Sequence, residues 1–182
     1  MGSYRVNAAG GTRGAAVSGD ITNLYQEMII DHARSPRNFR ALDGATRTVD
    51  AVNPLCGDQL TLYVQFTDGA VADIAFEGNG CAISQASASL MTMAVKGLQR
   101  EAALTLLTRV HTMLTTESQG DASVAEVGKL AALSGVWEYP ARVKCAALAW
   151  QAFRSALTEE ALRAGAGTER APITSALQNG TE

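Results

Sequence analysis

The chain has 182 residues, of which 47% are hydrophobic and 18% charged, with a formal net charge of −3 and a pI of about 5.4. This length and apolar content are typical of one globular domain with a buried core. The small acidic excess and the aromatic content of 5% argue against a nucleic-acid partner. No apolar run reaches the roughly 18 residues of a membrane-spanning helix, so we expect a cytoplasmic protein with no membrane partner.

A folded domain over 20–158 is predicted, with a flexible tail on each side. The N-terminal segment 1–19 is rich in Gly, Ala and Ser and has no apolar stretch typical of a secretory signal. The C-terminal segment 159–182 is also rich in small and polar residues and contains Pro172. Because the three cysteines are far apart and no export signal precedes them, we expect reduced thiols and not a disulfide framework.

The first predicted element is an amphipathic helix over 20–34. Asp20 suits its N-cap, and apolar residues follow at the helical spacing i, i+3, i+4 and i+7, namely Ile21, Leu24, Tyr25 and Met28. Ser35-Pro36 ends this helix, since a proline disfavours helical backbone at the residue before it. A short extended segment over 48–52 comes next and ends at Asn53-Pro54.

Two strands with alternating polarity follow, over 59–66 and 71–77. The first strand turns one apolar face toward a core, made by Leu60, Leu62, Val64 and Phe66. Asp68-Gly69 is a hairpin signal between the two strands, and the second strand is expected to turn Ala72, Ile74 and Phe76 inward. With the segment over 48–52, these strands predict a small antiparallel three-stranded sheet.

The rest of the domain is predicted to be helical. Gly78-Asn79-Gly80 breaks the second strand, and Pro140 suits the first turn of the last helix. A polar loop is expected over 115–123. The predicted helices cover 82–96, 101–113, 124–133 and 140–157. The fold class is therefore α+β, with helices packed on one face of the antiparallel sheet.

All three cysteines lie near the ends of predicted elements. Cys56 lies in a loop before the first long strand, and Cys81 opens a helix, whose N-terminal partial positive charge favours a thiolate. Cys145 lies in the first turns of the last helix beside Arg142 and Lys144, two cations that are expected to favour its thiolate as well.

Three thiolates at one point repel each other, and a divalent cation with a fourth ligand removes that repulsion. Asp58 is the natural fourth ligand because it lies two residues from Cys56. Three cysteines and one aspartate suit tetrahedral Zn²⁺, and the same thiolates suit an iron–sulfur cluster. The residues alone leave another interpretation open, in which isolated cysteines are small buried hydrophobic residues and Asp58 is a turn residue.

Several segments resemble the U-type scaffold family of iron–sulfur cluster assembly, which includes IscU, the N-terminal part of NifU, and SufU. They are Leu24-Tyr25 with Asp31-His32 and Pro36-Arg37-Asn38, then Asn53-Pro54-x-Cys56-Gly57-Asp58, then Phe76-x-Gly78-x-Gly80-Cys81-x-Ile83-Ser84, and Pro140-Ala141-Arg142-x-Lys144-Cys145. Two departures from IscU make the chain most similar to SufU: Lys144 stands where IscU has a histidine, and the segment between Cys81 and Cys145 is longer.

The resemblance implies an IscU/SufU-like fold and a Zn²⁺ ion held by Cys56, Asp58, Cys81 and Cys145. It also implies a pyridoxal-phosphate cysteine desulfurase of the SufS type as the partner, with downstream iron–sulfur assembly proteins as recipients. In the SufU type, a histidine of the desulfurase replaces Cys56 at zinc, and Cys56 then accepts the persulfide sulfur. Arg142 either steadies the charge of a thiolate or persulfide at this site or is a solvated residue at the start of the helix.

Two functions are therefore weighed, with a third, purely structural one beside them. The first is a zinc-dependent sulfurtransferase that takes persulfide sulfur from the desulfurase. The second is a non-enzymatic scaffold on which iron is bound and a [2Fe–2S] cluster is assembled and handed on. Lys144 and the longer segment favour the first. In the third, zinc only stabilises the fold.

Overall fold

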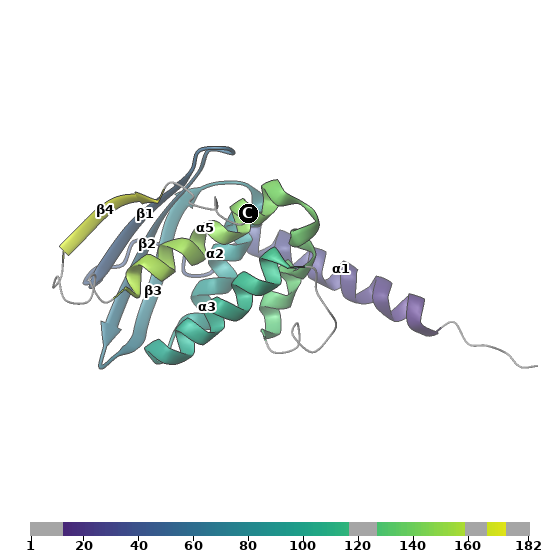
Figure 1. The fold of residues 1–182 in the computed structure, drawn as a ribbon, viewed down its shortest axis with the longest axis horizontal. Helices are drawn as coiled ribbons and strands as arrows, with labels where there is room; N and C mark the ends of the chain where they lie inside the picture. The colour runs from purple at the N-terminus through teal and green to yellow at the C-terminus, as the bar shows by residue number, and fades with distance from the viewer. Residues whose placement is uncertain (1–12, 117–126, 159–166, 174–182) are drawn as a thin grey trace, which may run out of the picture.

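The structure is a computed structural model that describes residues 13–116, 127–158 and 167–173 (Figure 1). In chain order, the elements are α1 (Arg13–Arg34), β1 (Arg47–Asn53), β2 (Asp58–Thr67), β3 (Ala70–Asn79), α2 (Ala82–Val95), α3 (Arg100–Thr115), the 3₁₀ helix η1 (Gly128–Glu138), α5 (Pro140–Ala156) and β4 (Gly167–Ile173). The predicted α+β class is confirmed, with helices packed against one face of a sheet.

The sheet has the strand order β3-β2-β1-β4. The three predicted strands are antiparallel neighbours, as expected. At one end of the sheet, Asn53 at the end of β1 lies opposite Asp58 at the start of β2, and Gln59 lies opposite Asn79 at the end of β3. The β1–β2 loop and the β3–α2 junction therefore lie at the same end of the sheet.

The fourth strand corrects the prediction of a flexible C-terminal tail for residues 167–173. β4 pairs in parallel with β1, which is otherwise an edge strand with backbone groups open to pairing. Small residues and Pro172 hide this strand in the sequence, because its pairing depends on a distant segment. Residues 159–166 and 174–182 of the expected tail lie outside the described residues.

The first helix begins earlier than predicted. α1 starts at Arg13, so that Asp20 lies inside the helix and does not cap it. The Ala- and Ser-containing stretch before Asp20 is compatible with helix, which is why the cap signal alone misplaced the start. Residues 1–12 of the expected N-terminal tail lie outside the described residues. The N-terminal part of α1 extends away from the body of the molecule (Figure 1).

The core lies between the sheet and its helices. α5 packs over β1 and β2, and α2 packs against β3 and α5. α3 packs against α5 and η1, and η1 also contacts α5 and α2. The largest fully buried side chains from the strands and helices include Phe76, Leu62, Ile74, Met91, Leu148 and Phe153. Burial of each such side chain contributes roughly 1.5–3 kcal/mol to folding, so this layer fixes how α2 and α5 sit on the sheet.

Two local predictions are wrong in detail. The β2–β3 register shifts between Gln65 and Phe66, and this bulge buries Val71 and exposes Ala72, which was expected to face inward. The helix predicted over 124–133 is a 3₁₀ helix that begins at Gly128, and residues 117–126, which hold most of the predicted loop, lie outside the described part.

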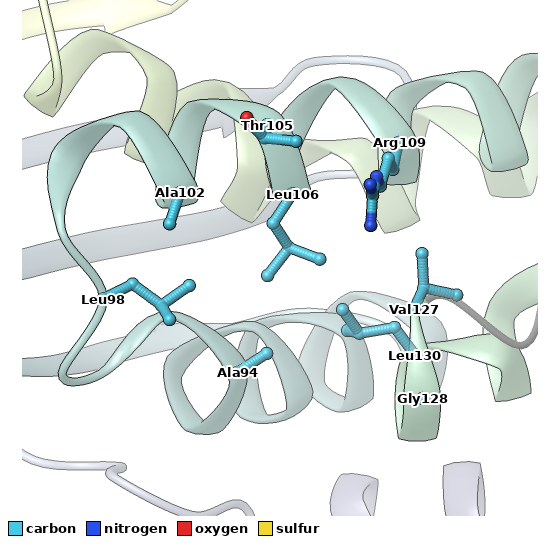
Figure 2. A pocket seen from close by; sticks show the side chains of 9 residues that line it. All are labelled: Ala94, Leu98, Ala102, Thr105, Leu106, Arg109, Val127, Gly128 and Leu130. Carbon is cyan, nitrogen blue, oxygen red and sulfur yellow. The ribbon is translucent and has the colours of Figure 1, made fainter.

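A hollow of about 510 Å³ lies between α2, α3 and the start of η1 (Figure 2). Its described lining is mostly apolar, with Thr105 and Arg109 from α3 as the polar members. The Thr105 hydroxyl donates to the backbone carbonyl of Glu101 in its own helix. Among the described residues that line the hollow, none is a cysteine, a histidine or a carboxylate. Among the described helices, none has both the length and the apolarity to cross a bilayer.

Candidate metal centre

The strand register and α5 bring the predicted ligand residues to one end of the sheet. Cys56 lies in the four-residue loop between β1 and β2, and Asp58 is the first residue of β2. Cys81 is the N-cap of α2, two residues after the end of β3. Cys145 comes from the second turn of α5, which packs over β1 and β2.

Three of the four residues form a close group. One sulfur or carboxylate oxygen from each of Cys56, Asp58 and Cys145 lies within 4.8 Å of the others, and the two sulfur atoms are 3.4 Å apart. Cys81 lies outside this group of three, but its sulfur is 3.7 Å from Asp58 Oδ2. The structure thus brings all four predicted residues to the same place, with Cys81 in contact with the Asp58 carboxylate.

The Cys56 loop is held by the residue that precedes it. The Gly57 N–H donates to the Asn53 carbonyl at 2.9 Å, and the Leu55 N–H donates to Asn53 Oδ1 at 3.2 Å. Gly57 has a φ of +76°, a left-handed conformation that glycine adopts without steric cost. Cys56 is therefore exposed on a loop of defined shape.

Asp58 has two roles at the centre. It is only 2% exposed, and its Oδ1 accepts the backbone N–H of Cys81 at 2.8 Å, which satisfies a donor at the start of α2. Its Oδ2 faces the Cys81 sulfur. The Asp58 carboxylate therefore links β2 to α2, the helix that Cys81 caps.

Two glycines allow β3 and the start of α2 to approach this carboxylate. A Cβ atom at Gly80 lies 3.0 Å from Asp58 Oδ1, and one at Gly78 lies 2.2 Å from the carbonyl oxygen of Gln59. The second distance is shorter than any real Cβ contact. The Gly78-Asn79-Gly80 break predicted from the sequence thus serves close packing at the site as well as ending the strand.

The pKa values of Asp58 and of the buried Cys145 thiol are shifted in opposite directions. Burial alone raises the pKa of Asp58, but hydrogen bonds from Cys56, from the Cys81 N–H and from Cys145 outweigh burial and hold this pKa below its usual value. Burial, together with the neighbouring Cys56 and Asp58, raises the pKa of the Cys145 thiol. This corrects the expectation that Arg142 and Lys144 favour its thiolate.

The donor set fits a tetrahedral cation rich in sulfur ligands. Zn–S bonds of about 2.3 Å place two sulfur ligands of a tetrahedral ion about 3.8 Å apart, and Cys56 and Cys145 are already 3.4 Å apart. A bound cation also favours deprotonation of a thiol ligand, which opposes the raised pKa of Cys145. These residues are therefore able to hold zinc or an iron–sulfur cluster.

Arg142 lies in the first turn of α5, on the same helix as Cys145. Its guanidinium carbon is 4.6 Å from the centre of the Tyr139 ring, in a cation–π contact, and the side chain is exposed. Its expected action on a thiolate or persulfide stays a prediction.

The two histidines are placed as packing and surface residues. Ser89 Oγ accepts the backbone N–H of Arg37 at 2.8 Å and lies 2.7 Å from Nδ1 of the buried His32. The contact between His32 Nδ1 and Ser89 Oγ links α1 to α2. Burial lowers the pKa of His32, which favours its neutral form. His111 is exposed on α3.

Asn53 is the residue whose role the sequence did not reveal. In the sequence it ends an extended segment and forms part of the Asn53-Pro54-x-Cys56-Gly57-Asp58 motif. In the structure its side chain is 1% exposed, and its Nδ2 lies 4.0 Å from the Cys145 sulfur. The signal for this role is the position of Asn53 opposite Asp58 in the sheet register, which is known only once the strands are paired.

The chain and its fold are similar to proteins of known type. The sequence profile described as the NifU-like N terminal domain matches residues 24–159. The zinc-dependent sulfurtransferase SufU of Bacillus subtilis is 39% identical over 141 residues, which cover 78% of this chain and 94% of that protein. The iron–sulfur cluster assembly scaffold protein IscU of Streptococcus pyogenes is 40% identical over 141 residues, which cover 78% of this chain and 87% of the relative.

A solved structure gives the same result for the fold. SufU from Fervidobacterium islandicum, described as a scaffold protein for the SUF system, superposes with a TM-score of 0.66 at 31% identity, and the match covers 72% of this chain and 95% of that one. The IscU/SufU-like fold that the resemblance implied is confirmed. Because the family profile spans most of the described residues, this chain belongs to the family of NifU-like N-terminal domains.

Proposed function

We propose that this protein acts in iron–sulfur cluster assembly as a zinc-dependent sulfur acceptor that takes persulfide sulfur from a SufS-type cysteine desulfurase. The observation that carries the proposal is the group formed by Cys56, Asp58 and Cys145, whose ligand atoms lie within 4.8 Å of one another at the edge of the molecule where Cys56 is exposed. The similarity to a zinc-dependent sulfurtransferase supports the same function.

Cys56, Asp58, Cys81 and Cys145 are the residues proposed to hold the zinc ion. When bound, zinc neutralises the clustered thiolates and keeps them from side reactions until a partner docks. Asp58 and Cys145 are buried and anchored in β2 and α5. They are therefore suited to hold the ion permanently.

Cys56 is the member of the set best placed to accept sulfur. Both Cys56 and Cys81 are exposed, but Cys81 caps α2, with its backbone N–H bound to Asp58 and its sulfur 3.4 Å from the Ser84 N–H. Cys56 lies on a loop that a partner can reach. We therefore assign the acceptor role to Cys56 and a fixed ligand role to Cys81.

The transfer step is a thiol–persulfide exchange. The Cys56 thiolate attacks the outer sulfur of the partner's cysteine persulfide, forming a new S–S bond on Cys56 while the S–S bond of the donor breaks. The donor cysteine leaves as a thiolate, so no external oxidant or reductant is needed. Arg142 is proposed to steady the negative charge that the exchange moves to this end of α5.

A second function uses the same donors. The similarity to an IscU scaffold protein favours assembly of a [2Fe–2S] cluster on the cysteines. The two functions differ in what the purified protein contains and does. One colourless zinc ion per chain, together with sulfur acceptance, supports the acceptor role. A brown cluster held by the same residues, with no stimulation of a desulfurase, supports the scaffold role.

The test combines metal analysis with sulfur transfer from a pyridoxal-phosphate cysteine desulfurase. We expect Cys56→Ala to abolish persulfide on this chain, while the other three residues retain part of the zinc. Cys81→Ala serves as the matched control because it also removes an exposed cysteine of the site. Since Cys81 is assigned a ligand role and not the acceptor role, the main effect of this change should be lower zinc retention. If the Cys56→Ala protein accepts sulfur as well as the parent, the assignment of Cys56 is wrong. If the parent carries zinc and no cluster, and leaves desulfurase turnover unchanged, the metal only stabilises the fold.

A further inference from the structure

We propose that Asn53 is a positioning residue of the metal centre, which holds the Cys56 loop with its carbonyl groups and orients the Cys145 sulfur with its side-chain N–H. This inference rests on the proposed zinc-binding function and concerns how two of its ligands are kept together. The two polar atoms of the side-chain amide have separate tasks, and the backbone carbonyl of Asn53 shares the task of Oδ1.

Burial makes the amide of Asn53 informative. The residue ends β1 and is 1% exposed, and a buried amide without partners costs several kcal/mol relative to water. Its two polar atoms are therefore expected to have definite partners. Both atoms point to the metal centre: Oδ1 contacts the loop that carries Cys56, and Nδ2 faces Cys145.

The acceptor half sets the position of Cys56. Asn53 Oδ1 accepts the N–H of Leu55, the residue before Cys56, and the Asn53 backbone carbonyl accepts the N–H of Gly57, the residue after it. The two hydrogen bonds, 3.2 and 2.9 Å long, thus bracket the cysteine. Cys56 is exposed but its backbone is fixed on both sides by one residue.

The donor half faces the Cys145 sulfur. Asn53 Nδ2 lies 4.0 Å from this sulfur, and the Ala141 carbonyl of the same helix as Cys145 lies 3.5 Å from it. Among the contacts of the described residues, the Asn53 side chain is thus the amide donor beside Cys145, and hydrogen bonds from neighbouring groups orient the side chains that hold a metal.

Substitutions of Asn53 can separate the contribution of Oδ1 from that of Nδ2. Asn53→Asp keeps an acceptor for the Leu55 N–H but replaces the donor by a negatively charged oxygen facing Cys145. Asn53→Ser keeps a shorter acceptor for the same turn and loses the donor without adding charge. If the side chain orients Cys145, zinc retention falls in the order parent, Ser variant, Asp variant. If it only holds the loop, the Asp variant retains zinc as well as the parent.

The experiment measures zinc affinity of the full chain by competition with a chromophoric chelator, which does not depend on sulfur transfer. Residues that support metal ligands typically contribute 10- to 100-fold to metal affinity, so we expect about that loss for Asn53→Asp and a smaller one for Asn53→Ser. Cobalt substitution gives a second signal, because the thiolate-to-cobalt absorption band weakens if Cys145 is displaced.

Asn38→Ser is the matched control. Asn38 also donates through Nδ2, to Thr92 Oγ1 at 3.0 Å, and its φ of +58° makes the change destabilising. It tests whether lost stability alone lowers zinc affinity, and we expect its affinity to be unchanged. Parent-like zinc affinity in a folded Asn53→Asp protein overturns the proposal, and if that variant does not fold, parent-like affinity in Asn53→Ser does so. Sulfur transfer by the parent is scored separately, so a failure of the proposed function is distinguishable.

Discussion

Leu55, beside the proposed acceptor Cys56, is 71% exposed, more than any other large apolar side chain among the described residues. In the proposed function, direct sulfur exchange brings the Cys56 sulfur into contact with the partner's persulfide, and we therefore expect the neighbouring Leu55 to be buried in the same interface. Complete burial of a leucine contributes about 1.5–3 kcal/mol. With 71% newly buried, the contribution is about 1–2 kcal/mol, or roughly 6- to 35-fold in Kd.

We therefore expect Leu55→Ser to weaken binding of the desulfurase by roughly this factor while leaving zinc content and folding unchanged. The assay is a titration of the desulfurase with each variant by calorimetry, with zinc measured in the same samples. Leu24→Ser is the control, since Leu24 is 60% exposed on α1 and lies outside the Cys56 loop. Equal affinity of the Leu55→Ser and parent proteins refutes the reasoning that this loop enters the interface.

Three further predictions concern the centre and the sheet. Asp58→Ala removes a proposed ligand and the acceptor at the start of α2, so zinc affinity should fall at least about tenfold in a chelator competition; unchanged retention excludes Asp58 as a ligand. Gly80→Ala places a Cβ 3.0 Å from Asp58 Oδ1, and we expect about 1–3 kcal/mol loss of stability in urea unfolding together with weaker zinc binding; a parent-like protein contradicts the packing argument. Asp73 contacts Lys96 and Arg40, each at 2.8 Å, and these hydrogen bonds lower its pKa to about 2. Because the unfolded carboxyl has a pKa of about 3.9, the stabilisation is complete above about pH 4 and is lost as the pH falls toward 2. Solvent screening of these partly exposed ion pairs leaves a stabilisation of about 1 kcal/mol. The free energy of unfolding of the parent should therefore exceed that of Asp73→Asn by about 1 kcal/mol at pH 6, and this difference should vanish near pH 2. A difference that does not depend on pH argues against the ion pairs.

Local signals in the sequence predicted the elements that depend on neighbouring residues. The hairpin at Asp68-Gly69 is present, with φ values of +51° and +77° that match a tight turn between twisted strands. Pro140 begins α5 as expected. The alternation over 59–66 correctly predicted the buried positions of β2 from Leu60 to Val64.

Features that depend on distant pairing were not predictable from local patterns. β4 joins β1 across more than a hundred residues of sequence, and the bulge that exposes Ala72 depends on how β3 is registered against β2. The same limit applies at the metal centre. The sequence indicated four residues, three cysteines and one aspartate, suited to one cation, but the burial that raises the pKa of Cys145 and the contacts of Asn53 arise only when α5 is packed on β1.

Asp58 couples occupancy of the centre to the stability of the first turn of α2. The carboxylate that faces the cysteines also accepts a hydrogen bond from the backbone N–H of Cys81, at the start of α2. Any event that pulls this side chain away lets the first turn of the helix fray, and any event that secures it slows that fraying. Amide hydrogen exchange at the start of α2 is thus a reporter of occupancy at the centre, readable without a colour change or a turnover assay.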